Sequence, residues 1–276
     1  MRHAESGGIM AQRSLVVYPT KDAVAQAGAQ RLLLAIADLL GERLAGGKTR
    51  TRVDAALTGG SDTIKALEYM ASNPLTDTID WTRVHLWWAD ERFVAADNGD
   101  RNALQARRML LDRLVAEGRL PESNIHEMAA DTRNAADIAA ADDTTANALL
   151  DEAARAYEHE LVRELGAVPV MDIAVMGMGP DGHYASLFPG HAEVSVTDRL
   201  VVGVNHSPKM PPLRLSMTAP LLAQTRRMWF LTAGAGKADA LAHVFATRND
   251  PAWPSSFADA TGELVWFTTP DAAAQL

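Results

Sequence analysis

Short apolar runs rich in β-branched residues alternate along this chain with longer stretches in which apolar positions recur every three to four residues. The short runs have the length and composition of buried strands, and the longer stretches have the spacing of helices with one buried face. Strands are expected at 14–18, 53–57, 83–89, 170–176, 200–204, 228–232 and 264–268, and helices at 24–44, 102–115, 145–165 and 237–247. This alternation predicts an α/β fold with a doubly wound, mostly parallel sheet flanked by helices.

Three segments depart from that alternation. Residues 129–147 are rich in Ala and Asp, which predicts a loop followed by an exposed helix start. Residues 207–214 contain three prolines, which excludes a helix interior and predicts an ordered loop. Residues 1–13 lack the apolar core of a signal peptide and are expected to be a flexible leader, with Met10 as an alternative start. We therefore expect one α/β domain at 14–276.

Composition narrows the classes of function. A net charge of −9 without a basic run argues against a nucleic-acid partner, since affinity for phosphate backbones comes from clustered Lys and Arg. No apolar run approaches the roughly 18 residues that a membrane helix needs, so no membrane partner is expected. The chain has no cysteine, which excludes thiol chemistry and fits a reducing compartment, so a cytoplasmic location is expected.

Three polar clusters each follow a predicted strand: TGGS at 58–61, DER at 90–92 and GMGPDGH at 177–183. The carboxyl ends of parallel strands lie at one edge of a sheet, where open α/β sheets bind their ligands. Three such clusters at one edge therefore predict a binding site rather than three unrelated turns.

In the first two clusters a structural interpretation competes with a functional one. Gly59 and Gly60 let the backbone approach a ligand, and Ser61 or Asp62 can cap the next helix, which suits a phosphate. The same residues also suit an ordinary tight turn.

In the DER cluster, Asp90 and Glu91 are candidate acid or base groups of the substrate site, and Arg92 is a candidate clamp for a phosphate or an oxyanion. The alternative is an Asp-Arg or Glu-Arg salt bridge that fastens a loop, which is a common arrangement.

The third cluster begins as G-x-G-x-x-G, the pattern of a dinucleotide-binding turn. That function needs a long helix after the third glycine and an acidic residue at the end of the next strand, but Pro189 interrupts the helix and Asp198 precedes the strand. What remains is Asp181 and His183 on a glycine-rich loop. His183 is a candidate general base oriented by Asp181, with a purely structural histidine as the alternative.

Lys209 and Arg214, on the proline-rich loop, are candidate ligands for a phosphorylated molecule. GAGK at 234–237 lacks the upstream glycine and the final Ser or Thr of a P-loop, so it is interpreted as a helix-entry turn. No His/Cys/Asp/Glu pattern has the spacing of a metal site, since no second histidine follows His159-Glu160. Neither a metal nor another cofactor is therefore expected.

Taken together, LTGGS, WWADERFV, MGMGPDGHYASLFPG and SPKMPPLRLSMT resemble the signature blocks of the 6-phosphogluconolactonases, in the glucosamine-6-phosphate isomerase/6-phosphogluconolactonase family. The blocks span residues 57–218, and the third is the most specific. The resemblance implies a Rossmann-like catalytic domain that hydrolyses 6-phospho-D-glucono-1,5-lactone in the oxidative pentose phosphate pathway. The expected partner is this small-molecule lactone, and the expected assembly is a monomer or small homo-oligomer.

The resemblance also implies roles for the candidates. His183 would activate water, with Asp181 orienting it. The phosphate would be held by Gly59, Gly60 and Ser61 with Arg92 and Lys209, and Arg92 or Arg214 would face the lactone carbonyl. The related turn usually continues with Thr-Pro, whereas this chain has Asp62-Thr63, so the roles of those two side chains stay open.

Two alternatives are retained. Glucosamine-6-phosphate deaminases of the same superfamily carry a glutamate five residues after the loop histidine, where this chain has Phe188. Phe188 cannot transfer a proton, which disfavours deamination. A non-catalytic sugar-phosphate sensor normally adds a helix-turn-helix segment, for which the short N-terminal stretch has no room, and a sensor does not need His183.

Overall fold

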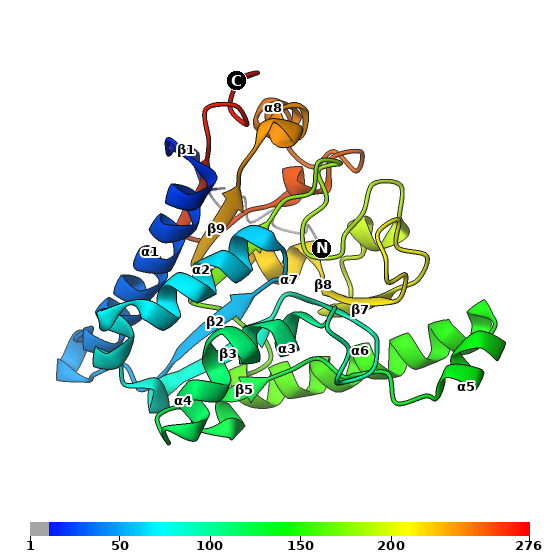
Figure 1. Cartoon of the computed structure of the whole chain (residues 1–276), viewed down its shortest axis with the longest axis horizontal. Helices are drawn as coiled ribbons and strands as arrows, with labels where there is room; N and C mark the ends of the chain where they lie inside the picture. Colours follow the sequence, from blue (N-terminus) through cyan, green and yellow to red (C-terminus); the bar gives the residue numbers. More distant parts are fainter. Residues whose placement is uncertain (1–10) are drawn as a thin grey trace, which may run out of the picture.

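The computed structural model describes residues 11–276, and within them the chain forms ten strands (Figure 1). They are β1 (Arg13–Val17), β2 (Val53–Leu57), β3 (Val84–Trp88), β4 (Asp90–Arg92), β5 (Ile125–His126), β6 (Ile173–Gly177), β7 (Val201–Val204), β8 (Arg214–Met217), β9 (Arg227–Thr232) and β10 (Glu263–Thr268). Seven form a parallel sheet in the order β1-β10-β9-β6-β2-β3-β5. The other three form an antiparallel sheet in the order β4-β8-β7. The predicted α/β class is confirmed.

Helices are present at all four predicted ranges, with ends shifted by up to three residues, and further helices lie outside those ranges. They are α1 (Lys21–Gly41), α2 (Ser61–Ser72), α3 (Asn102–Ala106), α4 (Asp112–Ala116), α5 (Ala135–Ala140), α6 (Asp143–Leu165), α7 (Ala219–Ala223) and α8 (Ala238–Ala246). A π-helical turn at Arg107–Leu111 joins α3 to α4, so the predicted helix 102–115 is continuous but irregular. The predicted loop at 129–147 contains α5 as well as the start of α6.

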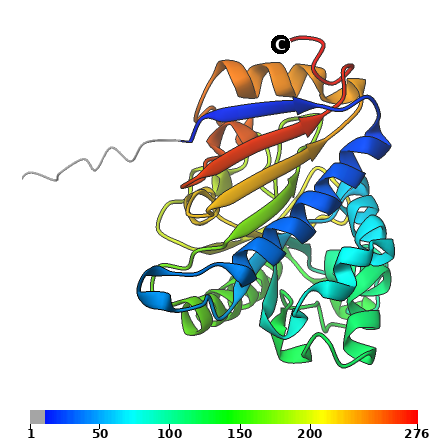
Figure 2. The ribbon, with the colours of Figure 1, turned by 90° about the vertical axis from the view of Figure 1, so that its left-hand side faces the viewer.

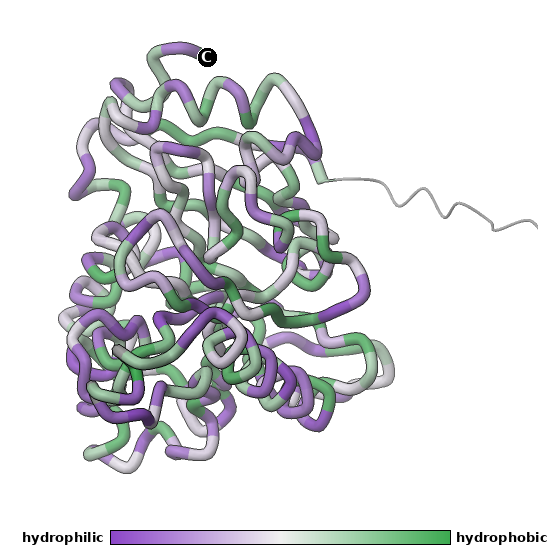
Figure 3. The backbone as a smooth tube through the Cα atoms, turned by 90° about the vertical axis from the view of Figure 1, so that its right-hand side faces the viewer, coloured by the Kyte–Doolittle hydropathy of each residue, from purple (hydrophilic) through white to green (hydrophobic). Residues whose placement is uncertain are grey.

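Helices cover both faces of the large sheet, which is what the doubly wound class requires. Alternate side chains of a strand point to opposite faces. On β10, the ring of Phe267 lies 4.7 Å below the guanidinium of Arg31 from α1, whereas Trp266 packs edge-on against Phe245 of α8 at 5.1 Å. α1 and α8 therefore lie on opposite faces, and Figure 2 shows α1 crossing the sheet. Hydrophobic stretches run through the interior between hydrophilic outer turns (Figure 3).

α1 is the one helix in residues 11–276 that is long and apolar enough, by length and composition, to cross a membrane. Here half of its most apolar window is buried against the rest of the protein. Gly28 of α1 packs against Leu231 of β9 so closely that a β-carbon would lie 2.8 Å from a leucine methyl. α1 is thus a core helix of the fold.

Several strand predictions need correction. The strand predicted at 170–176 begins only at Ile173. The strand predicted at 200–204 is β7, which belongs to the antiparallel sheet rather than to the parallel one. β4, β5 and β8 were not predicted, because none of them forms an apolar run: β4 and β8 each begin with a charged residue, and β5 has only two residues.

The predicted leader also needs correction where the structure describes it. Residues 1–10 lie outside the described residues. Ala11 is buried, and its N–H donates to Asp259 at 2.9 Å. Arg13 begins β1, which pairs with β10 along its whole length. Residues 11–13 are therefore part of the packed fold.

The strand order reverses between β2 and β6, which are neighbours in the sheet. After β2 the chain moves to β3 on one side, and after β6 it moves to β9 on the other. Connections that diverge in this way leave a crevice outside the carboxyl ends of the two strands. The residues after β2 and β6 are TGGS and the glycine-rich histidine loop.

Candidate active site

A cavity of about 240 Å³ lies at this crevice. All three polar clusters contribute to its lining, and so does the proline-rich loop. The lining residues are Thr58, Gly59, Gly60, Asp90, Arg92, Asn102, Gly177, Met178, Gly179, Pro180, His183, Ala185, Phe188, Lys209, Met210, Arg214 and Lys237. Clusters separated by up to about 120 positions in the sequence thus meet at one edge of the sheet, as the parallel strand order predicts.

Asp181 and His183 form a hydrogen-bonded pair beside this cavity. Their loop follows β6 and closes on itself, because the Gly179 N–H donates to the His183 carbonyl at 2.8 Å. The carbonyl of Gly182 accepts from both the N–H and the hydroxyl of Ser255, each at 2.7 Å, which fixes the middle of the loop. The Nδ1 atom of His183 then lies 2.5 Å from Oδ1 of Asp181.

The charge on Asp181 fixes which imidazole nitrogen carries the proton. Burial alone would raise the pKa of Asp181, but the hydrogen bond from His183 and the charges of His183 and Lys209 lower it to about 2. Asp181 is therefore an ionised acceptor near neutral pH, and Nδ1 of His183 is the donor. In neutral His183 this leaves Nε2 unprotonated, as a general base requires.

Phe188 packs on the other side of this histidine. Its side chain is buried, and the two ring centroids lie 4.6 Å apart. The phenyl ring has no donor or acceptor, so Phe188 cannot exchange a proton with His183. The backbone of this segment has no helix, consistent with the interruption expected from Pro189.

Within the described residues, four cationic side chains line the cavity: Arg92, Lys209, Arg214 and Lys237. Lys209 lies 3.8 Å from Asp181, and Lys237 donates to the Met178 carbonyl at 2.6 Å. Burial lowers the pKa of Lys237, and burial also lowers the pKa of Arg214, to about 10. Arg214 therefore remains cationic near neutral pH. A cluster of cations that share a small cavity favours an anionic ligand.

Arg214 also organises the proline-rich loop. Its Nε donates to the Pro211 carbonyl at 2.7 Å, and its Nη2 donates to the carbonyls of Lys209 and Met210 at 2.9 and 3.0 Å. None of these bonds uses Nη1. Arg92 donates to the Asp100 carbonyl through Nη1, while its buried Nε has no partner among the described residues. Each guanidinium therefore keeps donor capacity for a ligand.

Asp90 belongs to a buried network at the base of the cavity. It accepts from the hydroxyl of Ser186 at 2.7 Å, and its backbone carbonyl accepts from the side-chain amide of Asn102 at 2.9 Å. The Oδ1 atom of Asn102 is buried without a partner among residues 11–276. Asn102 is 1% exposed and lines the cavity, so this oxygen is available to a ligand hydroxyl or water.

Ser61 lies outside the cavity lining, unlike Gly59 and Gly60. The N-cap of α2 is Gly60, with φ +98°, so neither Ser61 nor Asp62 caps the helix as predicted. The hydroxyl of Ser61 and the carboxylate of Asp62 both contact Lys21 of α1 at 3.0 Å. These two side chains connect α1 to α2.

Glu91 also lies outside the lining, because successive side chains of β4 point in opposite directions. Asp90 and Arg92 point toward the cavity, and Glu91 points into the protein, where it is fully buried. It accepts from the backbone N–H groups of Arg92, Asn102 and Ala103 at 2.7 to 2.8 Å, and Arg101 lies 3.8 Å away. Burial raises the pKa of Glu91, opposed by Arg101 and these N–H groups.

We expect Glu91→Gln to destabilise the fold by about 1–3 kcal/mol, because one of the N–H groups then faces an amide donor. Urea unfolding of the variant would measure the loss. Glu152→Gln, on the exposed side of α6, is the matched control and should be close to neutral. Equal unfolding free energies for Glu91→Gln and the wild type would contradict this structural role.

Two lining residues lie outside the candidate segments and were missed by the sequence reasoning. Asn102 begins α3 and carried no motif signal. Lys237 was dismissed with GAGK as part of a helix-entry turn; the turn is present just before α8, but its lysine reaches the cavity. Lys237 could have been identified from the sequence by one signal. It follows a strand and a run of small residues, and that strand ends at the same edge of the sheet as the three clusters.

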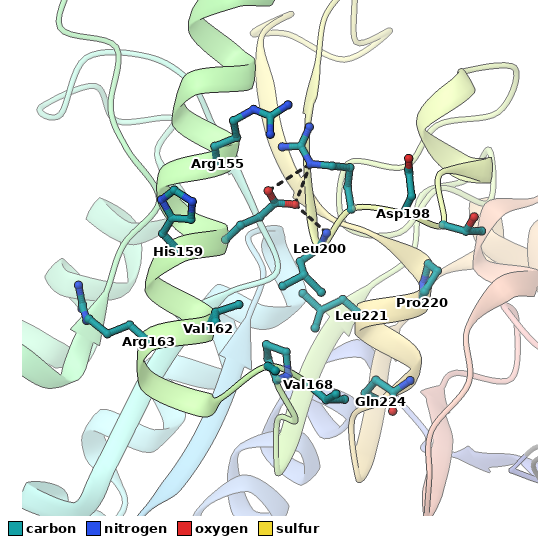
Figure 4. A pocket seen from close by; sticks show the side chains of 15 residues that line it. Arg155, His159, Val162, Arg163, Val168, Asp198, Leu200, Pro220, Leu221 and Gln224 are labelled. Carbon is teal, nitrogen blue, oxygen red and sulfur yellow. Dashed lines mark hydrogen bonds and ion pairs between the residues drawn. The ribbon is translucent and has the colours of Figure 1, made fainter.

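A larger groove of about 840 Å³ lies elsewhere, between α6, α7 and residues 197–200 (Figure 4). Arg199 and Glu158 both line it, and Arg199 donates to Glu158 at 2.9 Å. None of the predicted site residues lines this groove. The smaller cavity, which holds the histidine pair and the cations, is therefore the candidate active site.

Known proteins resemble this chain over almost its whole length. The profile of the family described as glucosamine-6-phosphate isomerases/6-phosphogluconolactonase matches residues 19–266. The 6-phosphogluconolactonase of Streptomyces coelicolor is 38% identical over 95% of this chain and 94% of its own length. That of Mycobacterium tuberculosis is 35% identical over 95% and 98%. In structure, 6-phosphogluconolactonase from Trypanosoma brucei superposes with a TM-score of 0.78 at 23% identity, covering 96% of this chain and 99% of that one.

Proposed function

The chain belongs to the glucosamine-6-phosphate isomerase/6-phosphogluconolactonase family, and from this premise we propose that it hydrolyses 6-phospho-D-glucono-1,5-lactone to 6-phospho-D-gluconate. The observation that carries the proposal is the Asp181–His183 pair at the edge of a small cavity lined by four cations. Hydrolysis of an ester in a phosphorylated sugar uses both features: a base that deprotonates water, and a cationic site that binds the phosphate.

In the proposed reaction, Nε2 of His183 takes a proton from water as the water oxygen attacks the lactone carbonyl carbon. Asp181 stabilises the resulting imidazolium through Nδ1. The tetrahedral intermediate collapses by breaking the bond between the carbonyl carbon and the ring oxygen. His183 returns the proton to that oxygen, which becomes a hydroxyl group. A lactone is an activated ester, so this route requires neither a metal nor a covalent nucleophile.

The cations supply binding and charge stabilisation. Gly59 and Gly60 present the start of α2, and with Arg92, Lys209 and Lys237 they form the proposed phosphate site. Arg92 or Arg214 is proposed to face the lactone carbonyl, where negative charge develops. When the phosphate is held, the distant lactone carbonyl is fixed in position next to the attacking water. Binding energy from the phosphate is thus used to orient the reacting groups.

We place this reaction in the oxidative pentose phosphate pathway and in the cytoplasm, carried out by a monomer or small homo-oligomer. The relatives named for this activity and the absence of cysteine support the pathway and the reducing compartment.

Turnover on two substrates tests the proposal. We expect the purified protein to hydrolyse the lactone at a rate unchanged by excess EDTA, and to release no ammonia from glucosamine 6-phosphate. Lactone disappearance is measured against the spontaneous reaction in the same buffer. Ammonia release would favour the deaminase reaction despite Phe188, and tight binding without turnover would favour a sensor. Loss of lactone turnover with EDTA would contradict the metal-independent route.

A further inference from the structure

A second cluster of histidines and carboxylates lies where β3, β5 and α6 meet. His85 is the second residue of β3, His126 ends β5, and Glu164 lies on the last turn of α6. His85 lies five positions before Asp90 of the active-site cavity, which corresponds to about 16 Å of extended chain. No residue of this cluster lines that cavity.

The three side chains converge on one place, where each offers a possible ligand atom. Nδ1 of His85 lies 3.0 Å from Nε2 of His126, and the ligand atoms of His85, His126 and Glu164 all lie within 4.8 Å of one another. In a tetrahedral zinc site with bonds of 2.0–2.1 Å, neighbouring nitrogens are about 3.3 Å apart. A small outward movement of the two rings therefore accommodates an ion between them.

An outer contact orients His126 in the way that metal-bound histidines are oriented. Its Nδ1 lies 2.7 Å from Oε1 of Glu160, so Nδ1 carries the proton and Nε2 presents its lone pair to His85. Its ring also stacks on Trp87, with centroids 3.8 Å apart. Glu160 and Glu164 project from the same side of α6 as the buried Tyr157, at spacings of three and four residues.

Glu164 already forms an ion pair with Arg52. Arg52 is bound by Asp54 at 2.5 and 2.9 Å and by Glu164 at 3.2 Å. A carboxylate has about four lone-pair sites, so Glu164 can contact Arg52 and an ion together.

We propose that His85, His126 and Glu164 bind one divalent transition metal of the Zn²⁺ class, with Glu160 as the outer partner of His126. Glu164 and His85 are partly exposed, which leaves room for water as the fourth ligand. The ion joins the edge of the parallel sheet to α6. It stabilises the fold and takes no part in lactone hydrolysis.

The test is titration of metal-free protein with Zn²⁺ by calorimetry and with Co²⁺ by its visible absorption. We expect one equivalent to bind per chain, with the spectrum of four-coordinate Co²⁺ and a rise in Tm. His85→Ala and Glu164→Gln should abolish binding, and Glu160→Gln should weaken it about 10- to 100-fold. Glu152→Gln on the same helix and His183→Ala in the active site are the controls, and both should bind as the wild type does.

The result is decisive even if His85→Ala fails to fold, because Glu164→Gln changes a partly exposed helix side chain. Absence of saturable binding to the wild type would overturn the proposal. So would loss of binding in His183→Ala with retention in Glu164→Gln, which would place the ion in the active-site cavity. Lactone turnover is measured separately, so neither outcome depends on the proposed activity.

Discussion

Replacing His183 with alanine should lower kcat for lactone hydrolysis by about 10²- to 10⁴-fold, the usual contribution of a general base. The cations that bind the phosphate remain in the variant, so KM should change much less than kcat. The measurement is initial-rate kinetics with the spontaneous hydrolysis subtracted. His206→Ala is the matched control, because His206 is an exposed histidine paired with Asp143 rather than with Asp181. Unchanged kcat in His183→Ala would remove the proposed base.

The variant Asp181→Asn distinguishes the role of Asp181 from that of His183. Asparagine has nearly the same shape but offers an amide in place of the ionised carboxylate, so it no longer fixes the proton on Nδ1 of His183. We expect kcat to fall in this variant while the overall fold is retained. A loss confined to KM would instead assign Asp181 to substrate binding.

The location of the candidate site could be predicted from the sequence, because the prediction required only the positions at which the strands end. Parallel strands align their carboxyl ends, so TGGS, DER and the histidine loop had to share an edge once their strands were recognised. The direction in which each side chain points was harder to predict. DER was interpreted as a loop in which all three side chains were available to a ligand, whereas it is the strand β4, whose alternation directs Glu91 away from the cavity.

Other residues had no local signal at all. Asn102 reaches the cavity because α3 starts beside Asp90, a contact that depends on tertiary packing. His85, His126 and Glu164 are spread over 79 positions of the sequence, and no motif with that spacing indicates a metal site. Short-range patterns therefore predict which segments carry chemistry, and the fold decides which side chains of each segment meet.

The glycines of GMGPDGH, first taken as a dinucleotide pattern, have distinct roles in the structure. A β-carbon on Gly179 would overlap both Nδ1 of His183 and Oδ1 of Asp181, the two atoms of the hydrogen bond between these side chains. A β-carbon on Gly177 would find only the Gly59 carbonyl oxygen, at 3.9 Å. Neither glycine has a positive φ, so an alanine at either position adds a methyl group without backbone strain.

We therefore expect Gly179→Ala to lower kcat by about 10²-fold, because the methyl group separates the histidine from its carboxylate and displaces the base. Gly177→Ala, two residues earlier in the same turn, should keep most of the activity. Steady-state kinetics of the two variants, with thermal unfolding to show that both are folded, makes the comparison. Equal activities would contradict the geometry of the pair. If Gly179→Ala alone loses activity while Tm is retained, the second glycine of the motif is required by the Asp181–His183 pair and not by a nucleotide.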